Sequence, residues 1–85
     1  AGAKGKRLAL RGKDLKKALM ENLDLSGCEL RNCCLDSASL AQTRFIAADL
    51  RGSTFFGTDL TGADLREAAV DIDALRHARN AEMRR

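Results

Sequence analysis

Residues 23–65 decide the fold of this chain and read LDLSGCELRNCCLDSASLAQTRFIAADLRGSTFFGTDLTGADL. A large apolar residue returns at every fifth position of this stretch, and the same period extends back to Leu10 and forward to Val70. All thirteen of these positions hold Leu, Met, Phe or Val. Thirteen consecutive repeats of one short unit indicate a solenoid-like architecture, in which each unit buries its apolar side against its neighbours.

The five-residue period fits neither a helix nor a flat strand. On an α-helix, five residues advance well beyond one turn, so the large residues would spiral around all sides. On a strand, residues five apart point to opposite faces. The period makes sense if the chain bends once in each repeat, so that every large residue returns to one interior. We therefore predict a coil around a central core, in which each repeat contacts mainly its neighbours.

The residues around each large position agree with this interpretation. Two positions earlier the residue is small in most repeats, as at Cys28, Ala48 and Ala63. Residues two apart on an extended chain share a face, so both positions point inward. Two positions after the large residue, most repeats have Gly, Asn or Ser, which favour the backbone angles of a sharp turn.

The repeats resemble those of the pentapeptide-repeat proteins, whose motif is A-(D/N)-L-x-x. Residues 48–52 (ADLRG) and 63–67 (ADLRE) match it most closely, and residues 58–62 (TDLTG) are near. The resemblance extends over residues 10–70 and implies an all-β solenoid. The family's fold is a right-handed quadrilateral parallel β-helix with four repeats in each square coil, which gives about three coils here.

Stacking at twenty residues makes a prediction about the core. It places Phe45 and Phe55 on opposite faces of about the same layer, and we expect their rings to approach each other there. Two flanking segments complete the domain organisation. Residues 1–9 form a glycine-rich basic arm, which we expect to be flexible. Residues 71–85 lose the period, and apolar residues recur there at helical spacing. We predict a short capping helix over residues 71–85 that covers the last coil.

The residue types do not favour catalysis or a metal site. Cys28, Cys33 and Cys34 are odd in number and lack the spacing of a zinc site, and His77 is the only histidine. We expect His77 on the surface of the capping helix. Unpaired cysteines fit a reducing compartment, so we expect a cytoplasmic protein. We find no nucleophile paired with a base and no phosphate loop, and therefore expect no enzyme, no cofactor and no metal.

Charged and exposed apolar residues give the candidate interaction sites. Arg11, Arg31 and Arg51 stack on one face, with acidic residues beside them. They form either a basic strip for phosphate or a lattice of cross-strand ion pairs, and the interleaved acids favour the ion pairs. Three apolar residues point outward on different faces and are candidates for partner contacts: Phe56, Ile46 and Leu19.

The resemblance implies several functions, so the fold alone does not select one. We expect a non-enzymatic scaffold or protein-interaction module, which could be part of a larger protein. Its partner would be another protein, and a homodimer through one end of the solenoid is one arrangement. The alternatives are a DNA-mimic that binds a type II topoisomerase such as gyrase, and weak nucleic-acid binding by the arginine ladder and the basic arm. The net charge is only +3, and no apolar run is long enough to span a membrane, so we expect neither nucleic acid nor membrane as the main partner.

Overall fold

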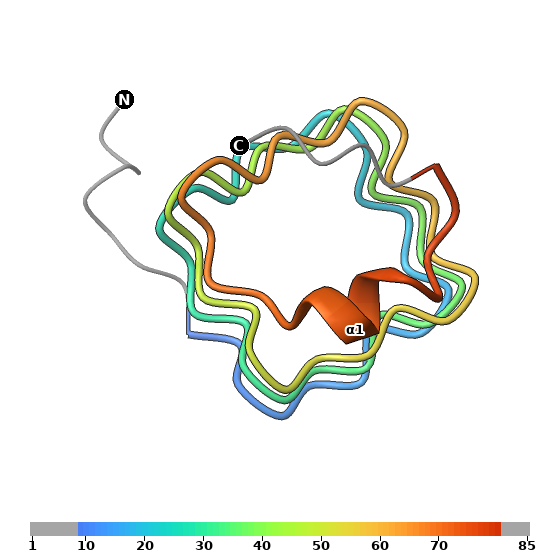
Figure 1. Ribbon diagram of the computed structural model, residues 1–85, viewed down its shortest axis with the longest axis horizontal. Helices are drawn as coiled ribbons and strands as arrows, with labels where there is room; N and C mark the ends of the chain where they lie inside the picture. The colour runs from blue at the N-terminus through green and yellow to red at the C-terminus, as the bar shows by residue number, and fades with distance from the viewer. Residues whose placement is uncertain (1–8, 81–85) are drawn as a thin grey trace.

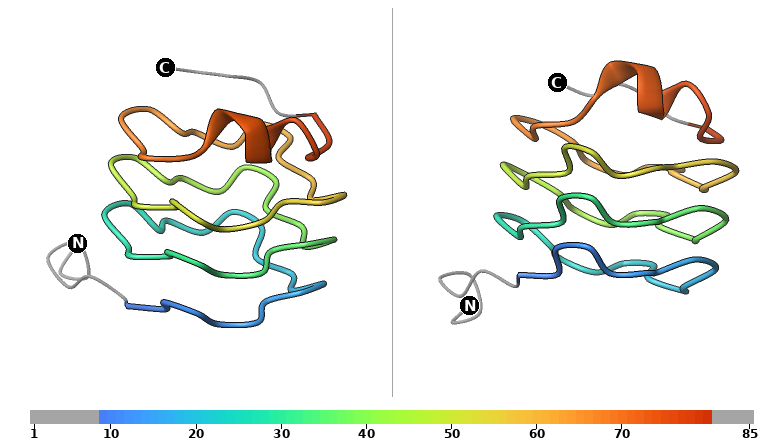
Figure 2. Two further views of the ribbon diagram at one scale, coloured as in Figure 1. Left: turned by 60° about the horizontal axis from the view of Figure 1, so that its bottom comes forward. Right: turned by 90° about the horizontal axis from the view of Figure 1, so that it is seen from below.

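The computed structural model describes residues 9–80 and shows the chain wound into coils around one core (Figure 1). The coils lie on top of one another from the N-terminal to the C-terminal end of this range (Figure 2). Each side of a coil ends in a two-residue turn. Within residues 9–80, one helix forms, α1 (Ile72–Leu75), and it lies over the last coil.

Ten isolated parallel bridges hold the coils together, and each joins residues twenty positions apart. Where Asp49 lies over Glu29, for example, two backbone hydrogen bonds form. The Asp49 N–H donates to the Cys28 carbonyl (3.0 Å), and the Leu30 N–H donates to the Asp49 carbonyl (2.8 Å). Twenty residues are four repeats, so equivalent positions of successive coils stack directly.

These bridges are single residues, and no longer strand forms within residues 9–80. The coil and its twenty-residue register are therefore observed directly, whereas the right-handed β-helix remains a prediction. The boundary of the basic arm is corrected by one residue, because Ala9 bridges Glu29 and belongs to the first coil. The rest of the arm lies outside the described residues.

The coil turns because every fifth residue adopts a left-handed backbone conformation. The twelve residues at this position, from Gly12 to Glu67, all have positive φ, between 58° and 79°. Glycine and asparagine occupy seven of them and adopt this conformation readily. At Gly52 a Cβ atom would lie 2.1 Å from the Asn32 Oδ1, so the Asn32 side chain would have to move to admit one. The other five residues at this position have less favourable side chains: Lys17, Ser37, Gln42, Ala47 and Glu67.

Five aspartates stabilise these turns. Each lies two residues before the first residue of a turn, and its Oδ1 accepts a hydrogen bond from the backbone N–H of that residue, at 3.0–3.2 Å. Such an Asx turn supplies an acceptor for a backbone donor that the bend leaves without a partner. The recurring carboxylate of the motif is therefore structural in these repeats: Asp14, Asp24, Asp49, Asp59 and Asp64.

The interior is filled by the large residues and by the small residues two positions before them, as predicted. From Leu25 to Leu65 every large position is at most 6% exposed. The small polar residues in the core satisfy their own donors, because each donates to the carbonyl of a large residue 23 positions earlier. These pairs are Cys33 with Leu10 (2.8 Å), Thr43 with Met20, Ser53 with Leu30 (2.5 Å) and Thr58 with Leu35 (2.6 Å).

The expected ring contact in the core is not formed. Phe45 and Phe55 are both buried, at 1% exposed, but the only aromatic pair among residues 9–80 is Phe56 with His77. Both rings belong to the one core cluster, and the twenty-residue register places Leu25 below Phe45 and Leu35 below Phe55.

The capping helix is much shorter than expected. It covers only Ile72–Leu75, and the chain is back in register at Arg79, which bridges Asp59. The five-residue period also continues beyond Val70, because Leu75 occupies the next large position and is 4% exposed. The helix thus replaces one side of a fourth coil, and residues 81–85 of the predicted helix lie outside the described residues.

Two residues explain why the coil gives way to α1. Position 72 is the next left-handed position, and a β-branched residue such as Ile72 is strongly disfavoured there. Position 73 is the next inward position, where the charge of Asp73 would be buried without a partner. In the helix, Asp73 is exposed and Ile72 is half exposed, so both conflicts disappear.

Candidate interaction surfaces

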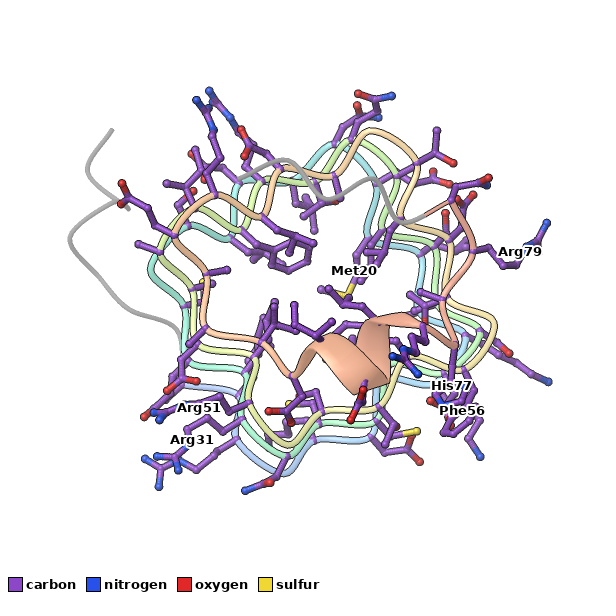
Figure 3. The ribbon with its side chains drawn as sticks, in the orientation of Figure 1. Met20, Arg31, Arg51, Phe56, His77 and Arg79 are labelled. Carbon is purple, nitrogen blue, oxygen red and sulfur yellow. The ribbon has the colours of Figure 1, made fainter. Side chains whose placement is uncertain are left out.

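The arginine ladder is engaged in ion pairs. Arg11 pairs with Glu29 at 3.1 Å, and both Arg31 (3.8 Å) and Arg51 (2.8 Å) approach the Asp49 carboxylate. Arg31 and Arg51 project outward from the same corner (Figure 3). The hydrogen bonds from Arg51, above all those of its side chain, lower the pKa of Asp49 to about 2. Two of these pairs, Arg11 with Glu29 and Arg31 with Asp49, join neighbouring coils, and the Arg51 pair with Asp49 lies within one repeat. Two carboxylates thus offset part of the positive charge of the three arginines.

Phe56 lies against His77. Their ring centroids are 4.4 Å apart and the planes are inclined by 26°, which is a stacked arrangement. The two rings project together from one corner of the coil (Figure 3). Phe56 remains 50% exposed, so the pair forms a small aromatic surface. The sequence placed His77 on a helix, but it follows α1, and the Gly57 N–H donates to its carbonyl at 2.9 Å.

The other two apolar candidates differ from each other. Leu19 is 82% exposed and lies in the first coil, where it bridges Ser39. Ile46 is half-buried at the turn before Ala47. Neither the register nor the structure brings Leu19, Ile46 and Phe56 into one patch.

The two ends of the coil differ in how well they are covered. At the C-terminal end Leu75 of α1 is buried. At the N-terminal end Leu10, Leu15 and Met20 are only half-buried, although the corresponding residues of the next coil are 0% exposed. Leu23, at an inward position, is 41% exposed, because no coil lies below it within the described residues. The sequence did not predict which of the two ends is less covered.

Within residues 9–80, the N-terminal end also has backbone donors that lack an acceptor. In the later coils the bridging residue donates its N–H to the coil below, as Cys34 does to Lys13 (3.0 Å). Among residues 9–80, the N–H groups of Asp14 and Leu19 have no such acceptor. An open row of this kind is a template for pairing with another chain.

The cysteines and the acidic residues form no recognisable chemical centre in the described part of the chain. Cys28 and Cys33 are buried and Cys34 is half-buried, all as free thiols. No group of three His, Cys, Asp or Glu side chains within residues 9–80 is close enough to hold a metal ion. No helix formed by these residues is long and apolar enough to cross a membrane.

Comparison with known proteins supports the resemblance seen in the sequence. The family model described as pentapeptide repeats matches residues 33–68, in eight copies. Residues 33–68 are therefore pentapeptide repeats. A search of curated proteins gives no significant match.

Proposed function

We propose that the chain is a non-catalytic protein-interaction module, and that a second copy of the chain docks on its N-terminal end. The observation that supports this is the difference between the two ends. Leu75 closes the C-terminal end, whereas Leu10, Leu15 and Met20 stay half-buried at the other. Covering these side chains would contribute about 25 cal/mol for each Å² of apolar surface removed from water.

A second copy fits this end in shape and in chemistry. Its end has the same square outline and the same five-residue spacing, so the corners of two copies can be superposed about a two-fold axis. The unpaired N–H groups of Asp14 and Leu19 would face carbonyl groups of the partner edge. Lys13 is exposed and can direct its amine past the apolar surface into water.

The same proposal includes the fold that the family implies. We infer that the coil is a right-handed quadrilateral β-helix, because its parallel bridges recur at twenty residues, which are four repeats. A partner can stack on the open end of a solenoid in the same way that its own coils stack on one another. Such an arrangement suits a scaffold.

The structure does not favour the two alternatives. Nucleic-acid binding by the arginine ladder would require free cations, but Arg11, Arg31 and Arg51 are paired with Glu29 and Asp49. Most of the basic arm lies outside the described residues. A DNA-mimic would present an excess of exposed carboxylates, whereas several aspartates here bond to the backbone of their own turns. Both therefore remain secondary.

The test is the solution mass of the whole 85-residue chain, measured by light scattering over a wide range of concentrations. We expect a dimer at high concentration. The Leu19→Pro variant should weaken it, because proline replaces an unpaired N–H and places its ring on the docking edge. The matched Leu19→Thr variant replaces the exposed apolar side chain with a smaller polar one but keeps the backbone N–H. It should retain more of the dimer.

A monomer at every concentration would overturn the proposed self-association. A dimer that Leu19→Pro leaves unchanged would place the interface elsewhere, and the aromatic pair of Phe56 and His77 would be examined next. Circular dichroism of each variant shows whether the coil is intact. Neither substitution removes a backbone hydrogen bond that the structure contains, so both are expected to fold.

A further inference from the structure

One bridge is missing from the C-terminal edge of the coil. Asp49 is bridged by Ala69, and Asp59 is bridged by Arg79. Thr54, which lies between them along the chain, is bridged from below by Cys34 but has no bridge partner above among residues 9–80. The residue that the register assigns to that place is Ala74, and it is part of α1.

The missing bridge leaves two backbone groups without partners. By the pattern of the other bridges, a residue that bridged Thr54 from above would donate its N–H to the Ser53 carbonyl. Its own carbonyl would accept the Phe55 N–H. The Ala74 N–H instead donates to the Asp71 carbonyl within the turn (3.0 Å). Among the described residues, the Ser53 carbonyl and the Phe55 N–H therefore remain unpaired. Backbone N–H and C=O groups are nearly always paired in folded proteins, and an added extended segment could pair with these two.

An open depression of about 570 Å³ lies at this gap, lined on one side by residues 52–54 and on the other by residues 71–74. Its rim is acidic. The Asp71 carboxylate accepts the Gly52 N–H (3.0 Å), and the Asp73 side chain is 91% exposed, with Arg76 at 3.8 Å. Ile72 adds a half-exposed apolar wall.

We propose that this gap binds an extended peptide segment with a basic side chain, whose central residue forms the missing bridge to Thr54. The backbone of the segment satisfies the Ser53 carbonyl and the Phe55 N–H, as an added strand does at a sheet edge. Its Lys or Arg lies against Asp71 and Asp73, and a neighbouring apolar side chain packs on Ile72. The site is at the opposite end of the coil from the N-terminal surface, so each of the two proposals can fail without the other.

The experiment uses blocked synthetic peptides and the isotope-labelled 85-residue chain, followed by NMR. We expect the peptide Val-Lys-Val-Lys to shift the amide signals of Gly52, Thr54 and Phe55, and to slow hydrogen exchange at Phe55. The peptide Val-Glu-Val-Glu should bind much more weakly, because the rim is acidic. The first peptide with methylated backbone nitrogens should not bind, because it has no donor for the Ser53 carbonyl.

Two variants distinguish this site from general adhesion of a basic peptide. Asp73→Asn should weaken binding of the lysine peptide, whereas Asp14→Asn, which removes a carboxylate at the far end of the coil, should not. Shifts centred on other residues would overturn the proposal. Equal binding of the glutamate peptide or of the methylated peptide would also overturn it, as would a Phe55 amide that is already fully protected in the free chain.

Discussion

Single residues in this chain matter chiefly through the backbone angles that they allow. The left-handed position of each repeat sets the direction of the next side of the coil. It is strained wherever the residue is neither glycine nor asparagine. The carboxylate of the motif acts at the same turns, where Asp59 accepts the Thr61 N–H (3.0 Å) and the hydrogen bonds of Thr61 lower the pKa of Asp59. Stability is thus controlled at the corners as well as in the core.

We predict that Ala47→Gly stabilises the chain. Ala47 has φ 61°, where a Cβ costs about 1–2 kcal/mol, and glycine removes that cost but adds about 0.5–1 kcal/mol of backbone entropy. The expected gain in the free energy of unfolding is about 0.5–1 kcal/mol. The matched control is Ala41→Gly, at a turn residue without positive φ, which should destabilise. Urea unfolding measures both, and a loss of stability in Ala47→Gly would contradict the prediction.

Stability should fall in acid, partly because of Asp49. Its pKa is about 2 in the folded chain and 3.8 for the free side chain. A lowered pKa means that its contribution is complete above pH 3.8 and is lost as the pH falls towards 2. Asp49→Asn should therefore lower the melting temperature at neutral pH and flatten its decrease between pH 4 and pH 2.

Asp73→Asn serves as the control for this pH dependence, since that carboxylate is 91% exposed and makes only a 3.8 Å contact with Arg76. It should leave the pH profile close to that of the parent chain. If Asp49→Asn and the parent lost stability in parallel, the pairing with Arg51 would not be a source of acid sensitivity.

At the scale of elements, α1 exists because two residues are incompatible with the coil. We predict that the double variant Ile72→Gly, Asp73→Ala converts residues 71–75 into a further side of the coil, with Ala74 bridging Thr54. Glycine permits the left-handed corner, and alanine fits the inward position. NMR would show a protected Phe55 amide, and the lysine peptide should no longer bind.

The single variant Ile72→Ala is the matched control for this conversion. It removes the β-branched side chain but leaves Asp73, whose charge still opposes burial, so α1 should persist. A double variant in which the Phe55 amide still exchanges freely would contradict the explanation given for α1.

At the scale of the whole molecule, the open N-terminal end should be the first part to unfold. In the first coil, the backbone N–H groups of Leu10, Leu15 and Met20 donate to carbonyls of the second coil at 2.8–2.9 Å. The corresponding residues of the second coil donate in the same way to the third. Because the hydrogen bonds of the two coils are alike, the lower burial of the first coil should make it the less stable of the two. In dilute solution we expect the amides of the first coil to exchange about tenfold faster than those of Leu30 and Leu35. Equal rates under conditions where the chain is a monomer would contradict this.

The sequence by itself determined the repeat, the inward and outward positions, the corners and the twenty-residue register, because these follow from local spacing that every repeat restates. It also indicated that the arginine ladder is paired, since acids alternate with it along the same face. The length of α1, the stack of His77 on Phe56, the open N-terminal end and the gap above Thr54 were decided only by the tertiary structure. These features lie at or near the ends of the coil. There the five-residue period no longer predicts which residue each side chain or backbone group contacts. The candidate sites lie at those ends because there alone the coil leaves its side chains and backbone groups without a neighbouring layer.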